Sequence, residues 1–384
     1  MEAYLDNSAT TRVVEPVKEI MIKTMTEDFG NPSSLHKKGV DAEHYIKNAR
    51  EEIAKTLKAK PGEIIFTSGG TESNNMAIIG TALANRRRGM HIITSTIEHA
   101  SVYNVFGFLE EEGFRVSYVP VDEYGHLRLD ELEKVLDDET ILVSVMYVNN
   151  EIGSVNPISE IVKLVKSKCP RALVHVDAIQ AYGKFRICPK QQGIDLLSVS
   201  GHKIHGPKGI GFLYIKEGTR IRPILYGGGQ QKGMRSGTDN VPGAAGLGVA
   251  AREMYNDFDK KTDYLYHIKE MFINELGQLE GAHVNGLTGR DSAPHVVSVS
   301  FDGVRSEVLL HALENKGVYV SSGSACSSNH PAVSGTLKGI GVEKEYLDAT
   351  LRFSFCVYTT EEEIHYCIQC LSELLPALRR YRRA

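Results

Sequence analysis

A polar stretch separates two apolar runs between residues 195 and 215, DLLSVSGHKIHGPKGIGFLYI. Its centre gathers hydroxyl, imidazole and amine groups within a few positions: Ser200, His202, Lys203, His205 and Lys208. A lysine amine held next to a buried strand is a nucleophile toward carbonyl compounds, with which it forms a Schiff base. Serine and histidine beside it are donors suited to an anion. Taken alone, Lys203 would more readily be a surface lysine in a loop, so the residues that accompany it decide whether the stretch is catalytic.

Polar side chains also follow the other predicted strands, at the edge where open parallel sheets bind their ligands. These polar residues include acids, a histidine, amides and hydroxyls. They are residues 68–72, Glu98, His99, residues 149–151, Asp177 and Gln180. Because the carboxyl ends of parallel strands meet at one edge, we expect these groups on one rim with Lys203.

The sequence SGGTESN at 68–74 is rich in glycine and opens a predicted helix. Backbone N–H groups at the positive end of a helix dipole suit a phosphate group. The pattern is not a P-loop, and Pro207 stands where the lysine of a P-loop would be in the similar stretch at 201–208. No G-x-G-x-x-G follows the first strand, which disfavours a dinucleotide. Without a phosphate, Gly69 and Gly70 would simply form a tight strand-to-helix turn.

A lysine, a phosphate site, an aspartate and a histidine together favour pyridoxal 5'-phosphate as the cofactor. The lysine amine would bind its aldehyde, and a carboxylate would keep its ring nitrogen protonated so that the ring can accept electrons. A flat side chain would cover the ring, and hydroxyl and N–H donors would hold the phosphate.

Short apolar runs alternate with helical patterns through the first half of the chain. Strands are predicted at 63–67, 91–95, 115–119, 141–147, 173–176 and 196–199. Helices are predicted at 72–84, 101–112, 130–136 and 159–168, the last two capped by Asp130 and Ser159. This alternation is typical of an α/β fold whose mainly parallel sheet is covered by helices on both faces. The strand at 211–215 follows too closely for a crossover helix, so it is expected to be antiparallel.

The pattern changes near residue 255. A long helix is predicted over 241–276, bent near Asp257, then the strands HVVSVSF and TLRFSF and a final helix from 360 to about 379. We expect a large α/β domain at 15–255 and a smaller α+β domain formed by 1–14 with 256–384. The smaller domain would carry a serine-rich cysteine loop at about 321–334.

Five motifs occur in an order that resembles one enzyme family. They are DAIQ from Asp177, SGHK from Ser200, GPKG from Gly206, RSGT from Arg235 and SSGSAC from Ser321. From YLDNSATT at the N-terminus to LRFSF near the C-terminus, the chain resembles the cysteine desulfurases, which are pyridoxal phosphate enzymes of the fold-type I, class-V aminotransferase-like group. The resemblance implies a mixed, mainly parallel sheet flanked by helices, with a smaller α+β domain.

The resemblance also implies roles around the cofactor. Lys203 would carry the Schiff base and later move the α-proton of the substrate, while Lys208 would be a bystander. His99 would stack on the ring and shuttle protons, Asp177 would pair with the ring nitrogen, and Gln180 would reach the phenolic oxygen. Taken alone, the last three would as readily be a structural histidine, a helix N-cap and a surface amide.

Other roles implied by the resemblance concern the phosphate and the substrate. The phosphate would be held by Gly70, Thr71, Ser200 and His202. Thr238 would reach the phosphate of the other subunit, which implies a homodimer. Asn150 would lie by the ring and the substrate carboxylate, and Arg352 would clamp that carboxylate through a bidentate pair; alone, they would be a turn residue and a strand arginine in an ion pair.

Cys326 lies in VSSGSACSSNHPAVSG, where small polar residues leave no apolar face to bury. A thiol in such a loop is expected to be reactive rather than part of a core. By resemblance, it would take sulfur from L-cysteine as a persulfide, release L-alanine and pass the sulfur to an acceptor or iron–sulfur scaffold protein. Cys326 could transiently ligate an iron–sulfur cluster together with that partner, and no other metal site is expected.

Composition agrees with a globular enzyme of the cytoplasm. The formal net charge is −4, which argues against nucleic acid as the main partner. The N-terminus lacks the pattern of a signal peptide, and no apolar run approaches the ~20 residues of a membrane span. The six cysteines show no framework spacing, so reduced thiols are expected.

Some alternatives stay open. A selenocysteine lyase would share the cofactor and fold, and a catalytically silent scaffold for cluster assembly would share the fold. Cys367 and Cys370, with His365 nearby, could be read as metal ligands, but their helical spacing favours core positions. Cys356 stands where the family usually has glycine, and no role is assigned to it.

Overall fold

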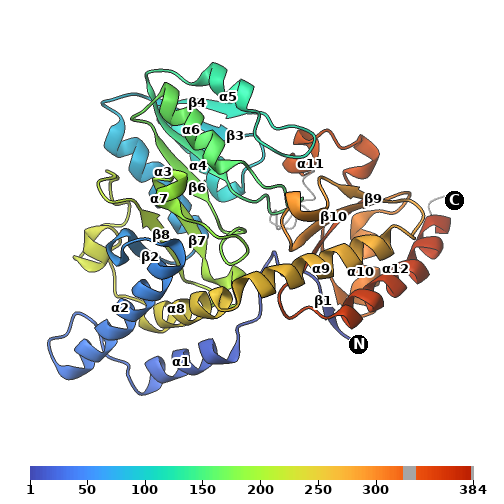
Figure 1. The fold of residues 1–384 in the computed structure, drawn as a ribbon, viewed down its shortest axis with the longest axis horizontal. Helices are drawn as coiled ribbons and strands as arrows, with labels where there is room; N and C mark the ends of the chain where they lie inside the picture. The colour runs from blue at the N-terminus through green and yellow to red at the C-terminus, as the bar shows by residue number, and fades with distance from the viewer. Residues whose placement is uncertain (323–333, 382–384) are drawn as a thin grey trace.

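The computed structural model describes residues 1–322 and 334–381 (Figure 1). Cys326 therefore lies outside the described residues. The large sheet comes from the first two thirds of the chain, and a second, smaller sheet comes from the last third. No described helix is long and apolar enough to cross a membrane.

The large sheet has seven strands in the order β2-β8-β7-β6-β5-β3-β4. In that order they are Ile64–Thr67, Gly211–Ile215, Leu196–Ser200, Leu173–Asp177, Thr140–Met146, His91–Ser95 and Arg115–Val119. Strand β8 pairs antiparallel with β2 and β7, and the other pairings are parallel. The mixed, mainly parallel sheet and the antiparallel strand at 211–215 are thus confirmed.

Helices cover both faces of this sheet because its strands are apolar on both faces. One core packs α2, α6 and α8 against residues such as Val143 and Leu197, and two smaller cores pack α3 and α4 against the opposite face, where Leu142 lies. The helices of this part are α1 Glu15–Thr26, α2 Lys37–Leu57, α3 Gly70–Asn85, α4 Ala100–Glu111, α5 Leu129–Val135, α6 Ile158–Lys168, α7 Pro189–Gln192 and α8 Val241–Tyr255, with 3₁₀ turns η1 Pro61–Glu63, η2 Gly201–Lys203 and η3 Gln230–Gly233.

The small sheet is antiparallel, with the order β12-β13-β10-β9. Its strands are Ser321–Ser322, Thr350–Ser354, Val296–Phe301 and Ala282–Asn285, and a separate parallel pair joins β1 Ala3–Tyr4 to β11 Val318–Tyr319. The remaining helices are α9 Phe258–Leu276, α10 Ser306–Glu314, α11 Gly335–Gly339 and α12 Glu361–Tyr381, with η4 Gly289–Asp291 and η5 Lys344–Tyr346. Most of these elements share a core of their own, to which the N-terminal strand also belongs, whereas Leu337 of α11 packs with Ile97, Val121 and Ile152.

The predicted long helix at 241–276 is two helices. Helix α8 ends before Asp257 and α9 begins after it, because the φ of 51° at Asp257 is left-handed and interrupts the helical path at the expected bend. The expected domain boundary near residue 255 falls at this break, and the division into two domains stays a prediction.

The predicted N-caps of α5 and α6 are wrong. The helices begin one residue earlier, at Leu129 and Ile158, and their cap positions hold Arg128 and Pro157 without a side-chain cap bond. Asp130 lies inside the first turn of α5 and pairs with Arg128 at 2.8 Å. An acidic group there still favours the helix through the dipole, so the sequence signal was real but its position was off by one residue or more.

Three further comparisons bear on the sequence analysis. Helices α1 and α2 were not predicted, although α2 packs closely on α8. Cys367 and Cys370 are buried in the small core, as expected from their spacing. His365 instead lies outside and pairs with Glu275 at 2.7 Å.

The contact of α2 with α8 gives a test of this packing. A Cβ atom at Gly248 would lie 2.6 Å from the Cα of Ala49, so Gly248→Ala must push the two helices apart. We expect a loss of about 1–3 kcal/mol in the free energy of unfolding, measured by denaturant titration. Gly107→Ala on α4 is the matched control, because no atom lies within 4 Å of its Cβ position, and it should be neutral or stabilising by up to about 1 kcal/mol. Equal effects of the two substitutions would contradict the tight helix contact.

Candidate active site

A cavity of about 320 Å³ opens at the carboxyl edge of the large sheet. It brings together ten of the residues singled out from the sequence: Gly70, Thr71, His99, Asn150, Asp177, Gln180, Ser200, His202, Lys203 and Arg352. Nine of them follow or end strands of the large sheet, because parallel strands deliver their carboxyl ends to one rim. Arg352 comes from β13 of the small sheet, so both sheets contribute to the cavity.

Two residues from the sequence analysis are not among them. Thr238 is exposed and does not line this cavity within the chain. Cys326 belongs to the residues that the structure does not describe.

The amine of Lys203 is held by the N-terminal segment. Its Nζ donates hydrogen bonds to the carbonyl oxygens of Ser8 and, at 2.8 Å, Ala9. The same segment reaches the neighbouring side chains: Gln180 donates to the Ser8 carbonyl at 3.0 Å, and Thr10 lies 3.2 Å from His202. A segment far away in sequence therefore forms the wall against which the amine lies.

Lys184, which the sequence analysis missed, lies behind Lys203. Its Nζ donates to the carbonyl oxygen of Lys203 at 2.6 Å, and the side chain is buried. Burial, reinforced by the charge of Lys203, lowers the pKa of Lys184 to about 7. The position of Lys184 at the end of YGK gives no sequence signal, since an isolated lysine reads as exposed.

Asp177 ends β6 with both carboxylate oxygens satisfied. Oδ1 accepts the backbone N–H of Ile179 at 3.0 Å, and Oδ2 accepts the side-chain nitrogen of Asn74 at 2.8 Å. Burial raises the pKa of Asp177, and these donors with the charges of His99 and Lys203 oppose that rise. The group is thus a shielded carboxylate at the floor of the cavity.

His99 caps helix α4. Its Nδ1 accepts the backbone N–H of Ser101 at 3.1 Å and lies 2.8 Å from the Ser101 hydroxyl. Since a backbone N–H can only donate, Nδ1 is the acceptor nitrogen, and neutral His99 carries its proton on Nε2. The imidazole is fixed by its own helix start, so its orientation follows from the local sequence EHAS.

The start of α3 forms an anion cup between β2 and β7. Gly69 has a φ of 151°, which favours glycine, and a Cβ at Gly70 would lie 2.2 Å from the side chain of Ile179. The cup therefore needs both glycines, and it exposes N–H groups at the positive end of a helix of 16 residues. His202 beside it is neutral near pH 7, because burial and the charge of Lys203 lower its pKa to about 4.

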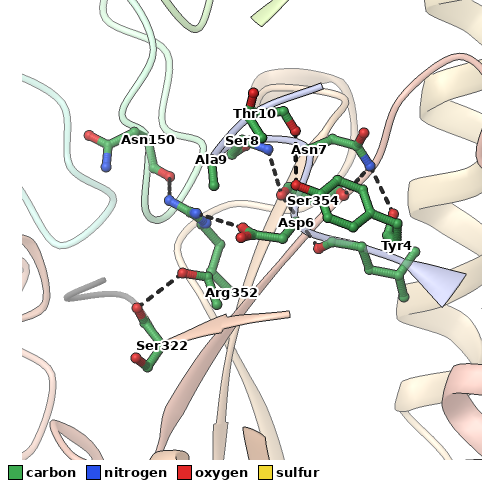
Figure 2. A network of polar contacts seen from close by, with 12 residues as sticks. Tyr4, Asp6, Asn7, Ser8, Ala9, Thr10, Asn150, Ser322, Arg352 and Ser354 are labelled. Atoms are coloured by element: carbon green, nitrogen blue, oxygen red, sulfur yellow. Dashed lines mark hydrogen bonds and ion pairs between the residues drawn. The ribbon is translucent and has the colours of Figure 1, made fainter. Parts of the chain in front are cut away.

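Arg352 is oriented by two separate parts of the chain (Figure 2). Its guanidinium donates to the carbonyl oxygen of Asn150 at 2.9 Å and forms an ion pair with Asp6 at 2.9 Å. The arginine side chain is only 7% exposed and lines the cavity. This arrangement supports a fixed cation that faces an anionic group of a ligand.

Glu98 is a second acid near the cavity. Its Oε1 accepts the Ser95 hydroxyl at 2.6 Å and the backbone N–H of Met146 at 3.0 Å, which ties the end of β3 to the end of β5. Its Oε2 is buried and has no partner among the described residues. Burial raises the pKa of Glu98 to about 8, so the carboxyl is mostly neutral at pH 7.

Comparison with known proteins places this geometry in a family. The family model described as aminotransferase class-V matches residues 3–367. The chain belongs to the class-V aminotransferase family. Its similarity to the cysteine desulfurases, predicted from the motifs, is confirmed: a protein of Methanosarcina thermophila named cysteine desulfurase IscS is 44% identical over 376 residues, covering 98% of this chain and 92% of that protein. A protein of Dictyoglomus turgidum with the same name is 43% identical and covers 98% of this chain and 95% of its own length.

Solved structures agree with this class-V aminotransferase assignment. A structure titled NifS-like protein superposes with a TM-score of 0.93 at 39% identity, covering 98% of this chain and 100% of that one. A NifS-like protein from Rickettsia africae superposes with a TM-score of 0.87 at 28% identity, covering 97% and 99%. The predicted fold class is confirmed by these structures.

The unusual carboxyl of Glu98 predicts a pH dependence of stability. With a pKa near 8 in the folded state against an ordinary value of 4.5, the folded protein binds an extra proton between these values. The contribution of Glu98 to the free energy of unfolding should therefore fall as pH rises from about 5 to about 8, while the buried histidines, whose pKa values are lowered, act in the opposite direction below about pH 6.5. Glu98→Gln removes this dependence, which denaturant midpoints across that range would show. Glu139→Gln, at an exposed position, is the control and should keep the wild-type change of midpoint with pH. If Glu98→Gln also keeps the wild-type change, the raised pKa of Glu98 is contradicted.

Proposed function

We propose that this chain is a pyridoxal phosphate-dependent cysteine desulfurase. The observation that carries the proposal is one cavity that joins Lys203, Asp177, His99 and Arg352, in a chain whose relatives bear that name. In the net reaction, L-cysteine loses its sulfur atom to an enzyme thiol, which becomes a persulfide, and leaves as L-alanine.

The residues present fit the cofactor. A buried carboxylate, a lysine amine and a glycine cup at a helix start lie around one cavity, and a Cβ at Gly70 of the cup would lie 2.2 Å from the Ile179 side chain. Asp177 would hold the ring nitrogen, His99 and Gln180 would lie by the ring, and the phosphate would take donors from Gly70, Thr71, Ser200 and His202. When bound through Lys203, pyridoxal phosphate withdraws electrons from the bonds around the α-carbon of an amino acid.

Lys203 and His99 would handle protons in this site. The Lys203 amine would move the α-proton, and neutral His99 carries its proton on Nε2 because its Nδ1 already accepts from Ser101. Neighbouring groups that could interfere are neutral near pH 7, since burial lowers the pKa of His202 and raises that of Glu98. Proton transfer would therefore be confined to Lys203 and His99.

Arg352 would bind the carboxylate of L-cysteine, with Asn150 beside it. The guanidinium is buried and held by Asp6 and the Asn150 carbonyl, so little side-chain entropy remains to be lost on binding. This supports selection for α-amino acids over simple amines.

Cys326 would be the sulfur-accepting thiol. This role rests on the serine-rich sequence around it, and the persulfide would pass to an acceptor or iron–sulfur scaffold protein, where the thiol could ligate a cluster transiently. Burial raises the pKa of the Cys356 thiol, which makes this cysteine a poor nucleophile. A cytoplasmic location stays a prediction, as does the absence of nucleic-acid and membrane partners.

The enzyme would act as a homodimer in which Thr238 serves the phosphate of the other subunit. Two groups of exposed apolar side chains support contact with a second copy of the chain. They are Met25, Phe29, Leu35 and Val40 around α1 and α2, and Leu225 and Tyr226 in the loop that leads to Thr238. An exposed Thr238 on that loop agrees with a role outside its own cavity.

Cys326→Ala should abolish persulfide formation and alanine production from L-cysteine while the protein keeps its yellow cofactor. The reason is that only the sulfur acceptor is lost. Persulfide labelling with mass spectrometry and an alanine assay measure the two effects. Cys356→Ala is the matched control and should keep at least half of the activity. Normal turnover by Cys326→Ala would transfer the role to another thiol, and faster turnover of selenocysteine than of cysteine by the wild type would favour a selenocysteine lyase.

Lys203→Ala should lose the visible absorbance of the bound cofactor and all turnover, since no amine remains to bind the aldehyde. Lys208→Ala, five residues on, is the control that should stay yellow. Both are measured by absorbance after addition of pyridoxal phosphate and gel filtration. A wild-type protein that stays colourless in the same procedure, or a yellow Lys203→Ala variant, would disprove the cofactor assignment.

A further inference from the structure

Asn74 is a buried amide that none of the proposed roles uses. It lies on α3 one turn after Gly70 and is fully buried. Its side-chain nitrogen donates two hydrogen bonds, to Oδ2 of Asp177 at 2.8 Å and to the hydroxyl of Ser101 at 2.9 Å. Both protons of the amide nitrogen therefore form hydrogen bonds to groups beside the cavity.

The Ser101 hydroxyl continues this contact to His99. It accepts from Asn74, so its own proton is directed to Nδ1 of His99 at 2.8 Å. The order of donors is fixed by chemistry, because an amide nitrogen can only donate and Nδ1 already accepts the backbone N–H of Ser101. One amide on α3 thus connects the carboxylate at the cavity floor with the imidazole at its wall.

The carboxylate of Asp177 depends on such donors. It is 5% exposed, and an ionised carboxylate in that environment is costly unless donors satisfy it. The charged and titratable groups that act on it are His99 and Lys203, which favour ionisation, and Glu98, which disfavours it. The direct donors are only two, the backbone of Ile179 and the side chain of Asn74. Asn74 is therefore the only side chain among the described residues that donates a hydrogen bond to this carboxylate.

We propose that Asn74 is a positioning residue: its amide keeps Asp177 ionised and oriented toward the cofactor, and through Ser101 it holds His99 in the same frame. This rests on the proposed function, since only a ligand with a protonated ring nitrogen needs an ionised Asp177. The signal for Asn74 lies within SGGTESN, where it shares a helix face with Gly70 four residues earlier.

The consequence is a change in how cofactor binding depends on pH. Without the Asn74 donor, Asp177 retains its proton to a higher pH, and a neutral carboxyl cannot pair with a protonated ring nitrogen. Cofactor should then be released on acidification at a higher pH than in the wild type. At alkaline pH, where Asp177 is ionised in both proteins, retention should differ little.

The test titrates the holoenzyme with acid and measures released cofactor and remaining visible absorbance. For Asn74→Leu, and for Asn74→Ala as a second variant of smaller size, the midpoint of release should rise by about one pH unit, the shift expected from one lost hydrogen bond to a charged group. Asn75→Leu is the matched control: Asn75 lies on the same helix, its amide donates to the backbone carbonyls of Thr71 and Ser101 and not to Asp177, and the variant should release cofactor as the wild type does. Ser101→Ala keeps the bond from Asn74 to Asp177 and should also leave the midpoint nearly unchanged.

Three outcomes would overturn the proposal. They are an unchanged midpoint in both Asn74 variants, an equal loss of cofactor at every pH, which indicates packing alone, and a shift in Ser101→Ala as large as that in Asn74→Leu. A wild-type protein that binds no pyridoxal phosphate would instead reject the proposed function, so the two failures are distinguishable.

Discussion

The contact between the N-terminal segment and the rim of the large sheet is the constraint on which the site depends. Carbonyl oxygens of Ser8 and Ala9 hold the amine of Lys203, and the Ser8 carbonyl also accepts from Gln180. Two residues earlier, Asp6 holds Arg352 of the small sheet (Figure 2). One short segment, which turns at residues 7–9, thus contacts both the amine and the guanidinium. Hydrogen bonds to backbone carbonyls are well suited to this, because they depend on the path of the chain rather than on particular side chains.

Burial decides which groups around the cavity carry charge. Desolvation lowers the pKa of Lys184 to about 7 and that of His202 to about 4, and it raises the pKa of Glu98 to about 8. Each shift favours the neutral form, because none of these groups has an ionic partner close enough to offset the loss of water. Burial also raises the pKa of Asp177, but its two hydrogen-bond donors and the charges of His99 and Lys203 oppose that rise. Arg352 forms an ion pair with Asp6. The site therefore presents a few defined charges against a background of neutral polar groups.

The side chains that the two sheets bring to the cavity are held in place in different ways. The large sheet is buried on both faces, so the residues that end its strands, such as Asp177 and Ser200, are fixed by packing on either side. Among the described residues that line the cavity, Arg352 is the one from the small sheet. Its guanidinium is held by Asp6, which pairs with the end of β13, and by the carbonyl oxygen of Asn150, which follows β5 of the large sheet.

The sequence by itself determined the α/β class, the antiparallel strand at 211–215 and the polar residues that line the cavity at the carboxyl edge of the large sheet. These follow from the alternation of strands and helices and from the residues after each strand, which are local patterns. It also indicated the core positions of Cys367 and Cys370, since helical spacing is local. Only the tertiary structure decided the partners. Asn74, Ser101 and Lys184 act through contacts between segments far apart in the chain, and nothing in their neighbours along the sequence reports which group they will meet. Helices α1 and α2 were missed, although the buried residues of α2, from Ala42 to Leu57, follow helical spacing. Only the tertiary structure shows that this face packs on α8.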